Sequence, residues 1–188
     1  MRCGVFVGLA AMLWAGAAQA GPVEEVRTAA LYHDVLHPGS DAEEGADIEI
    51  DVVFREWEGL KFLGRPKINV TAAANTAGDT NFASVGLVWD KDFSDRWFGE
   101  AQFGYAVHDG EVDIPAGVPP SVFKEDHIVF GSRDLFRGAL ALGYRVDERW
   151  NVAVEWVHLS HGEVLGGGDD YNTGVDAVGI RIGRKIGN

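Results

Sequence analysis

The stretch at residues 150–160 reads WNVAVEWVHLS, and the stretch at residues 175–186 reads VDAVGIRIGRKI. In both stretches, large apolar side chains alternate with small or polar ones at every second position. A period of two is the pattern of a β-strand that has one apolar face. The two stretches therefore predict a pair of adjacent antiparallel strands, joined by the connection at residues 161–174.

The same period recurs through the rest of the chain, whereas helical periodicity is hard to find. We predict eight strands, each with one apolar face and one face of charged, amide or very small side chains. They run over Val26–Leu36, Ala46–Arg55, Lys67–Ala74, Phe82–Asp90, Trp97–His108, Leu135–Arg145, Trp150–Ser160 and Val175–Ile186. The connection at Glu56–Pro66 is long for a hairpin, and the sequence gives no account of it.

Alternation alone leaves open which face of the strands points outward. A soluble barrel keeps its apolar face inside, and a membrane barrel turns it toward lipid. Aromatic residues stand at the ends of the apolar faces, as in a membrane girdle, and the opposite faces are rich in Gly and Ala, which suits a narrow lumen. The predicted fold class is therefore all-β, an eight-stranded antiparallel transmembrane β-barrel. The girdle residues are Trp89, Trp97, Tyr144, Trp150 and Trp156.

The N-terminal residues have the pattern of a secretory signal peptide. Arg2 is followed by an apolar run that is short for a transmembrane helix, and AQA at residues 18–20 is a cleavage pattern. We expect residues 1–20 to be removed and residues 21–188 to form a single domain. The only cysteine, Cys3, leaves with the signal peptide, so the mature chain has no disulfide.

The charge of the chain excludes one class of partner. With 16 basic and 29 acidic residues, its formal net charge is −13. Nucleic acid requires a basic surface to neutralise its phosphates, so we predict no nucleic-acid partner. No segment after residue 20 is apolar for long enough to be a transmembrane helix, which leaves strands as the means of crossing a membrane.

Three polar residues fall on the apolar faces of the last two predicted strands. Following Trp156 by parity leads to His158 and Ser160, and following Val178 backward leads to Asp176. All three lie at the same end of the strand pair, beside the connecting loop. Polar groups on a lipid face are unfavourable and therefore suggest a function. Serine, histidine and a carboxylate are the nucleophile, base and orienting acid of acyl transfer.

A less specific interpretation also fits these residues, because serine and histidine are common where a strand meets water. A metal site is not favoured, since His158 and His161 point to opposite faces of an extended strand. We predict neither a metal nor a cofactor.

The arginines of the predicted strands allow two roles. Arg133, Arg137 and Arg181 either bind lipid phosphates or balance acids in the lumen. The inward parity of Arg181 favours the second role for that residue. The acids predicted to face the lumen are Asp51, Glu100 and Glu155.

Four motifs resemble those of the lipid A 3-O-deacylase family of outer-membrane barrels. They are FGSRDLF at residues 130–136, GYR at 143–145, HLS at 158–160 and NTGVD at 172–176. That family carries H-x-S-N, a variable loop, and N-x-G-x followed by an acid in its last hairpin. The resemblance implies an eight-stranded barrel with its catalytic residues on the outer wall.

Carried over residue by residue, the resemblance makes His158 the base, Ser160 the nucleophile and Asp176 the acid. The family has glutamate at this last position, so aspartate is a shorter substitute. It also has asparagine where this chain has His161, so we expect His161, Gly162 and Asn172 to support the oxyanion.

The implied function is hydrolysis, without a cofactor, of an ester-linked acyl chain of lipid A in lipopolysaccharide. The 3-O position is the one that the resemblance favours, and the outer membrane is the implied location. Two alternatives remain: a non-enzymatic small barrel with a structural or adhesive role, and a soluble periplasmic lipocalin-like binder. The sequence leaves open whether the protein is a monomer or a homodimer.

Overall fold

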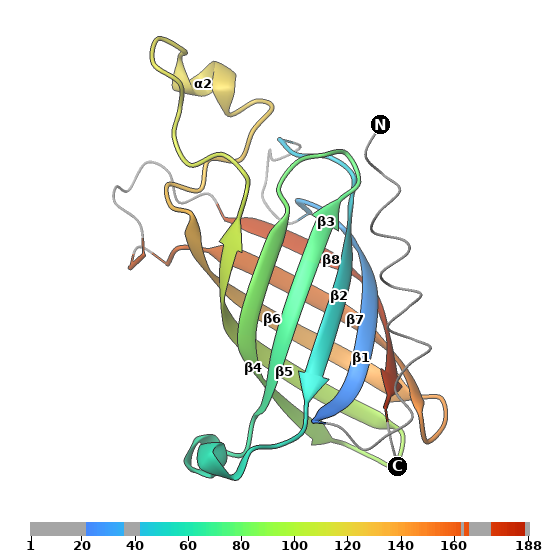
Figure 1. The fold of residues 1–188 in the computed structure, drawn as a ribbon. Coiled ribbons are helices and arrows are strands. Elements are labelled where there is room, and N and C mark those ends of the chain that lie inside the picture. The colour runs from blue at the N-terminus through green and yellow to red at the C-terminus, as the bar shows by residue number, and fades with distance from the viewer. Residues whose placement is uncertain (1–21, 36–41, 163, 166–173, 187–188) are drawn as a thin grey trace.

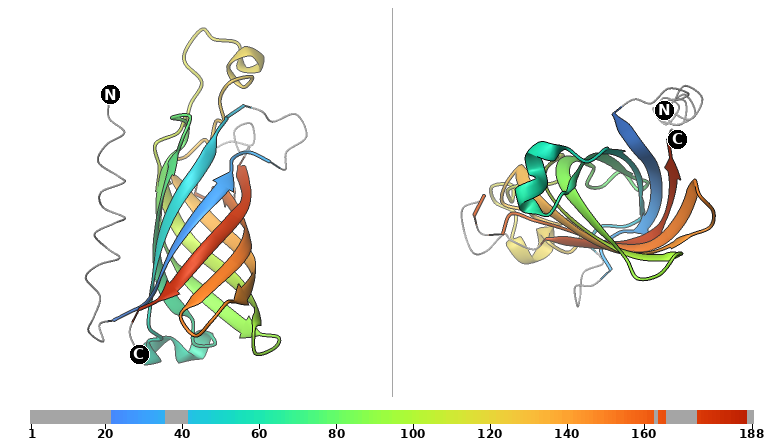
Figure 2. Two further views of the ribbon diagram at one scale, coloured as in Figure 1. Left: turned by 90° about the vertical axis from the view of Figure 1, so that its right-hand side faces the viewer. Right: turned by 90° about the horizontal axis from the view of Figure 1, so that it is seen from below.

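The structure, a computed structural model, describes residues 22–35, 42–162, 164–165 and 174–186. Eight antiparallel strands form a closed barrel in which each strand pairs with the next and β1 pairs with β8 (Figures 1 and 2). The predicted signal peptide lies outside the described residues. The strands are β1 (Val23–Tyr32), β2 (Ala46–Phe54), β3 (Lys67–Asn75), β4 (Phe82–Asp92), β5 (Trp97–His108), β6 (Asp134–Arg145), β7 (Trp150–Ser160) and β8 (Val175–Lys185).

Every predicted strand is present, and the predicted bounds of β5 and β7 are those of the structure. The prediction for the first strand was wrong at both ends, because β1 begins at Val23 and ends at Tyr32. Beyond Tyr32 the backbone leaves the extended region, since Asp34 has a φ of 53°. At its start, β1 is extended by pairing with both neighbours, with Val23 opposite Phe54 of β2 and Glu25 opposite Lys185 of β8.

The apolar faces of the strands point outward, as predicted for a membrane barrel. Large hydrophobic residues on the outer wall are at least 50% exposed, including Phe103, Leu140, Val154 and Ile180. No helix within the described residues is long and apolar enough to cross a membrane.

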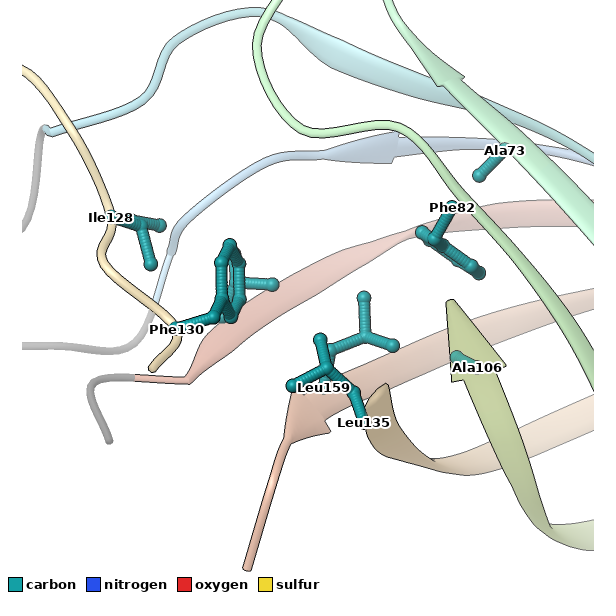
Figure 3. Packing of buried hydrophobic residues seen from close by; sticks show 8 residues of the cluster. Ala73, Phe82, Ala106, Ile128, Phe130, Leu135 and Leu159 are labelled. Carbon is teal, nitrogen blue, oxygen red and sulfur yellow. The ribbon is translucent and has the colours of Figure 1, made fainter. Parts of the chain in front are cut away.

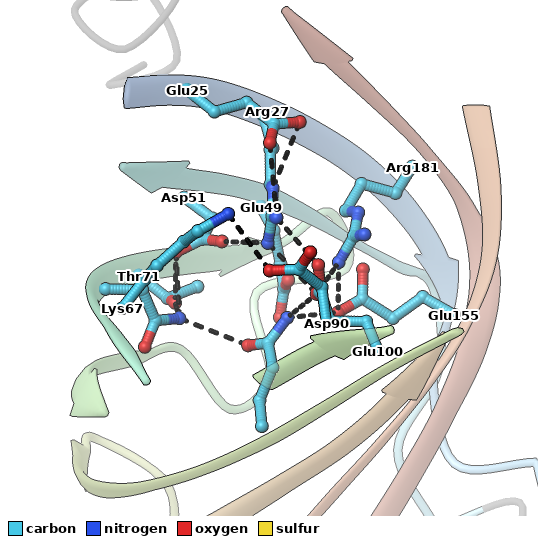
Figure 4. Close-up of polar contacts among 12 residues, drawn as sticks. Glu25, Arg27, Glu49, Asp51, Lys67, Thr71, Asp90, Glu100, Glu155 and Arg181 are labelled. Carbon is cyan, nitrogen blue, oxygen red and sulfur yellow. Dashed lines mark hydrogen bonds and ion pairs between the residues drawn. The ribbon is translucent and has the colours of Figure 1, made fainter. Parts of the chain in front are cut away.

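The inward faces carry side chains that are joined in a network of ion pairs and hydrogen bonds inside the barrel (Figure 4). Arg27 and Arg181 both donate to Glu100, at 2.7 Å in each case, and Arg137 donates to Glu49 at 3.1 Å. Charged groups in a low-dielectric interior are tolerated only when they are paired. The polar faces of the strands must therefore all point into the lumen, where their charges can pair. The buried members of the network are Glu25, Arg27, Glu49, Asp51, Glu100, Arg137, Glu155 and Arg181.

Two of the three arginines for which the sequence left two roles open belong to this network. Arg181 faces the lumen acids, as its parity predicted, and Arg137 lies with it. Arg133 lies outside the network and donates to the backbone carbonyl of Gly110 at 2.7 Å.

An apolar cluster occupies the barrel interior at the end with the long connections (Figure 3). Leu159 of β7 and Val175 of β8, which are cross-strand partners, are both 2% exposed within it. The long connection between β5 and β6 contributes Ile128 and Phe130 and also carries the short helix α2 (Pro120–Phe123). The cluster therefore fixes the ends of β7 and β8 from the inside.

The long connection at Glu56–Pro66, which the sequence left unexplained, forms the 3-10 helix η1 (Glu58–Leu63) at the opposite end of the barrel (Figure 1). Gly64 ends this helix in a left-handed conformation with a φ of 87°, which favours glycine. The indole of Trp89 donates to the carbonyl of Leu63 at 2.9 Å. This bond ties η1 to β4.

At the end of the barrel opposite η1, the buried residue His33 links the connections between neighbouring strands. The ring of His33 lies between two carboxylates, with Nδ1 2.7 Å from Asp47 and Nε2 2.9 Å from Glu43. Glu43 also accepts hydrogen bonds from the hydroxyl and backbone of Thr80, at 2.9 and 3.2 Å. Burial by itself would lower the pKa of His33, but the hydrogen bonds to Asp47 and Glu43 outweigh it and raise that pKa to about 10.

The charge on His33 gives a pH-dependent prediction for these connections. Because the pKa of His33 is higher in the folded chain than in the unfolded chain, the protonated ring stabilises the fold. This contribution is fully present at pH values below the unfolded pKa, about 6.5. It is lost as the pH rises through the folded pKa, about 10. We expect proteinase K to cut the connections faster at pH 11 than at pH 7. In His33→Gln, cleavage at pH 7 should already be fast and change little by pH 11. Equal protection of the wild type at both pH values would contradict a stabilising role for protonated His33 between Asp47 and Glu43.

Candidate active site

The end of β7 presents two predicted catalytic residues to the outside of the barrel. Leu159 points inward and is held in the apolar cluster. Because side chains alternate along a strand, its neighbours His158 and Ser160 must point outward. Both are partly exposed, as are Val154 and Trp156 on the same face. The packing of one leucine thus sets the direction of both polar side chains.

The acid reaches the histidine across the strand pair. Asp176 of β8 is the direct cross-strand partner of His158, and its Oδ1 lies 3.0 Å from the Nδ1 of the imidazole. A carboxylate can only accept, so Nδ1 carries the proton in this bond. That tautomer leaves Nε2 free to accept a proton from another group. Strand register alone therefore brings together two of the three residues predicted to be catalytic.

A fourth residue, which sequence reasoning placed in the aromatic girdle, belongs to the same cluster. The indole Nε1 of Trp156 donates to Oδ1 of Asp176 at 2.8 Å. The indole also stacks against the His158 ring, with centroids 6.0 Å apart and planes 27° from parallel. Parity put Trp156 on the same face as His158. Its bond to the acid, however, depends on the side-chain direction and on the register with β8.

Ser160 lies on the same face as His158, two residues further along. The hydrogen bonds of the described residues do not join its hydroxyl to the His158 ring. Nucleophile and base are often further apart without substrate than during the reaction, so this geometry is compatible with a catalytic pair. Across the β6–β7 register, Ser160 lies opposite Phe136.

Glycines keep the surroundings of this pair open. Gly174, just before β8, has a φ of 54°, and a Cβ there would lie 3.1 Å from Cε1 of His158 and 3.4 Å from Cβ of Ser160. Gly138, opposite His158 on β6, has nothing within 4 Å of the position of a Cβ. A side chain at Gly174 would therefore press on the site, whereas Gly138 leaves space beside the imidazole.

The residues predicted to support an oxyanion are placed differently from one another. The His161 side chain is 1% exposed, so it is enclosed while Ser160 is partly open. Gly162 is exposed, has a φ of 58°, and lies near the ring of Phe136. Asn172 lies outside the described residues. The oxyanion role of all three stays a prediction.

The backbone of the first connection also touches the site. The N–H of Val35 donates to the carbonyl of Asp176 at 3.0 Å. Val35 follows His33, whose ring is held by Asp47 and Glu43. The start of β8 is thus fixed both by β7 and by the segment that follows β1.

An apolar groove of about 380 Å³ lies on the outer wall, and its lining includes Phe136, the cross-strand partner of Ser160. The ring of Phe136 stacks on that of Phe103 at 5.5 Å. Side chains that line it come from β3 to β6 and from the connection that carries η1. They include Trp57, Leu60, Val85, Leu87, Phe103 and Phe136.

Within the described residues, no group of three His, Cys, Asp or Glu side chains is placed to hold a metal ion.

The sequence model of one family, lipid A 3-O-deacylase (PagL), matches residues 45–185, a span that contains β2 to β8 and all three candidate catalytic residues. The chain belongs to this family. It is an outer-membrane β-barrel of a family of lipid A deacylases, which rules out the soluble lipocalin-like alternative.

Solved structures agree with the barrel fold of the lipid A 3-O-deacylase family. A crystal structure of the outer membrane enzyme PagL is similar to this chain with a TM-score of 0.60 and 16% identity, covering 85% of this chain and 97% of that one. A de novo designed transmembrane β-barrel has a TM-score of 0.53 and 14% identity, covering 89% and 98%. At these identities the likeness shows the fold alone. No curated protein matches the chain in sequence.

Proposed function

We propose that the protein hydrolyses the ester-linked 3-O-acyl chain of lipid A through a Ser160–His158–Asp176 triad on the outer wall of the barrel. The observation that supports this proposal best is the 3.0 Å bond between His158 and Asp176, on the face that also carries Ser160. A histidine hydrogen-bonded to an acid on a lipid-facing wall suggests a function, because polar groups are unfavourable there.

The proposed reaction is acyl transfer in two steps. The hydroxyl oxygen of Ser160 attacks the ester carbonyl while Nε2 of His158 takes the hydroxyl proton. Asp176 stabilises the imidazolium, which then gives its proton to the departing sugar oxygen. Water attacks the resulting acyl-serine with the same base, releasing the fatty acid and restoring Ser160.

The oxyanion formed in each step requires hydrogen-bond donors near Ser160. We assign this role to backbone N–H groups of the turn at His161 and Gly162, since the His161 side chain is enclosed. In this turn the carbonyl of His161 accepts hydrogen bonds from the N–H groups of Val164 and Leu165, both at 3.2 Å.

The groove beside Phe136 suits the apolar part of such a substrate. Its lining is aromatic and aliphatic, and it lies on the surface that faces lipid. An acyl chain bound there stays within the hydrocarbon layer, so the enzyme need not transfer it through water.

Mass spectrometry of the lipid tests the function directly. Purified protein in detergent, incubated with lipopolysaccharide, should yield lipid A lighter by one ester-linked acyl chain together with an equal amount of free fatty acid. The same preparation unfolded by heating serves as the control and should leave lipid A unchanged. Intact lipid A after incubation with the folded protein, or loss of an amide-linked chain instead, would contradict the proposal.

A further inference from the structure

Trp156 contacts two members of the proposed triad at once. Its N–H bonds to the same carboxylate oxygen of Asp176 that His158 contacts, at 2.8 Å, and its ring lies along the imidazole. We propose that Trp156 is a positioning residue that holds Asp176 in the direction His158 requires. This inference rests on the proposed function of the site.

The location of Asp176 explains why such a residue is needed. By strand parity its side chain is on the lipid-facing side, yet it is only 6% exposed. A carboxylate shielded from water is unfavourable unless hydrogen bonds offset the loss of hydration. The indole N–H supplies one such bond. Tryptophan has only two side-chain torsion angles, so little conformational entropy is lost when the ring is held in place.

Strand geometry also makes the contact specific. Trp156 lies opposite Val178, and His158 lies opposite Asp176, so the indole reaches the acid along a diagonal of the β7–β8 pair. Diagonal neighbours on one face of a sheet are within reach of aromatic side chains. Two donors from one strand therefore meet one oxygen atom of the other, which fixes the carboxylate along the strand as well as across it.

Trp150 offers a matched comparison. It is a second tryptophan on the same face of the same strand, but its ring packs against the guanidinium of Arg184 at 5.4 Å, at the other end of β7. If tryptophans on this face only anchor the barrel at a membrane interface, exchanging either one for phenylalanine should have the same effect. A positioning role predicts that only Trp156 affects the reaction.

The test compares Trp156→Phe with Trp150→Phe in the same detergent. Phenylalanine keeps an aromatic ring and removes the N–H. We expect W156F to lower kcat on lipopolysaccharide about tenfold, the size expected for one hydrogen bond to a charged group, with KM within about twofold. W150F should leave both constants unchanged. Electrophoresis with and without heating checks that each barrel has closed.

Two further measurements make the outcome decisive. In a variant that already carries Asp176→Asn, adding W156F should cause no further loss, because the indole acts through the acid. The labelling rate of Ser160 by a fluorophosphonate should fall in W156F as kcat does, and this readout does not require lipid A as substrate. Slower labelling in W156F, with a wild type inactive on lipopolysaccharide, would keep the positioning role and reject the substrate. Equal labelling of W156F and wild type, or an undiminished loss in the D176N background, would overturn the role.

Discussion

Exchange of Ser160 for alanine is expected to lower the rate of lipid A deacylation at least about 10⁴-fold, the usual consequence of removing a triad nucleophile. The reason is that the acyl-enzyme cannot form without the hydroxyl oxygen. Binding should change little, because Ser160 is a small side chain on a broad apolar wall. The release of fatty acid from lipopolysaccharide, followed by mass spectrometry, measures the loss.

A second serine provides the control for that experiment. Ser84 lies on the inner face of β4 and is 8% exposed, so it cannot meet a lipid substrate. Ser84→Ala should therefore keep wild-type activity. Wild-type release by S160A, with the barrel closed in both variants, would remove Ser160 as nucleophile and leave the family membership of the chain intact.

The lumen network predicts the largest effect on stability. Glu100 accepts hydrogen bonds from Arg27 at 2.7 and 3.0 Å and from Arg181 at 2.7 Å. Glu100→Gln keeps the shape of the side chain and removes its charge, which leaves two buried guanidinium groups with one fewer counter-charge. Removing one partner of a buried ion pair costs about 3–5 kcal/mol. We expect a loss of that size in the free energy of unfolding, measured by urea titration of the barrel in lipid vesicles.

An exposed ion pair separates this effect from the general consequences of removing an acid. Asp92, at the end of β4, pairs with Arg145 at the end of β6, and the carboxylate is 59% exposed. Water screens such a pair, so Asp92→Asn should cost less than about 1 kcal/mol. Equal losses in E100Q and D92N would mean that the lumen charges contribute no more than surface charges do.

Much of the candidate site followed from local pattern. The parity of β7 placed His158 and Ser160 on one face, and the parity of β8 placed Asp176 at the matching end. Both inferences need only the two-residue repeat of a strand, which short segments carry by themselves. The hydrogen bond between His158 and Asp176 follows from adding the register of one hairpin.

Other features did not follow from local pattern. The indole of Trp156 was expected only at the membrane interface, and its bond to Asp176 depends on a side-chain direction that parity leaves open. The bounds of β1 depend on pairing with two other strands, β2 and β8, the second of which lies at the far end of the chain. The 3-10 helix η1 has only six residues, which is too short for a helical period to be recognised in the sequence.

The sequence by itself determined the strands, their two unlike faces and the three residues that lie out of place on an apolar face, because strand periodicity is a local property. The aromatic girdle predicted which face is the lumen, but only the closed barrel decided which polar side chains meet there. Closure brings Arg27 to Glu100, 73 residues away, and Asn151 to Glu25, 126 residues away. Buried charged and amide groups are stable only where they can bond to one another, so the polar faces turn inward and the residues at the ends of β7 and β8 are left facing lipid.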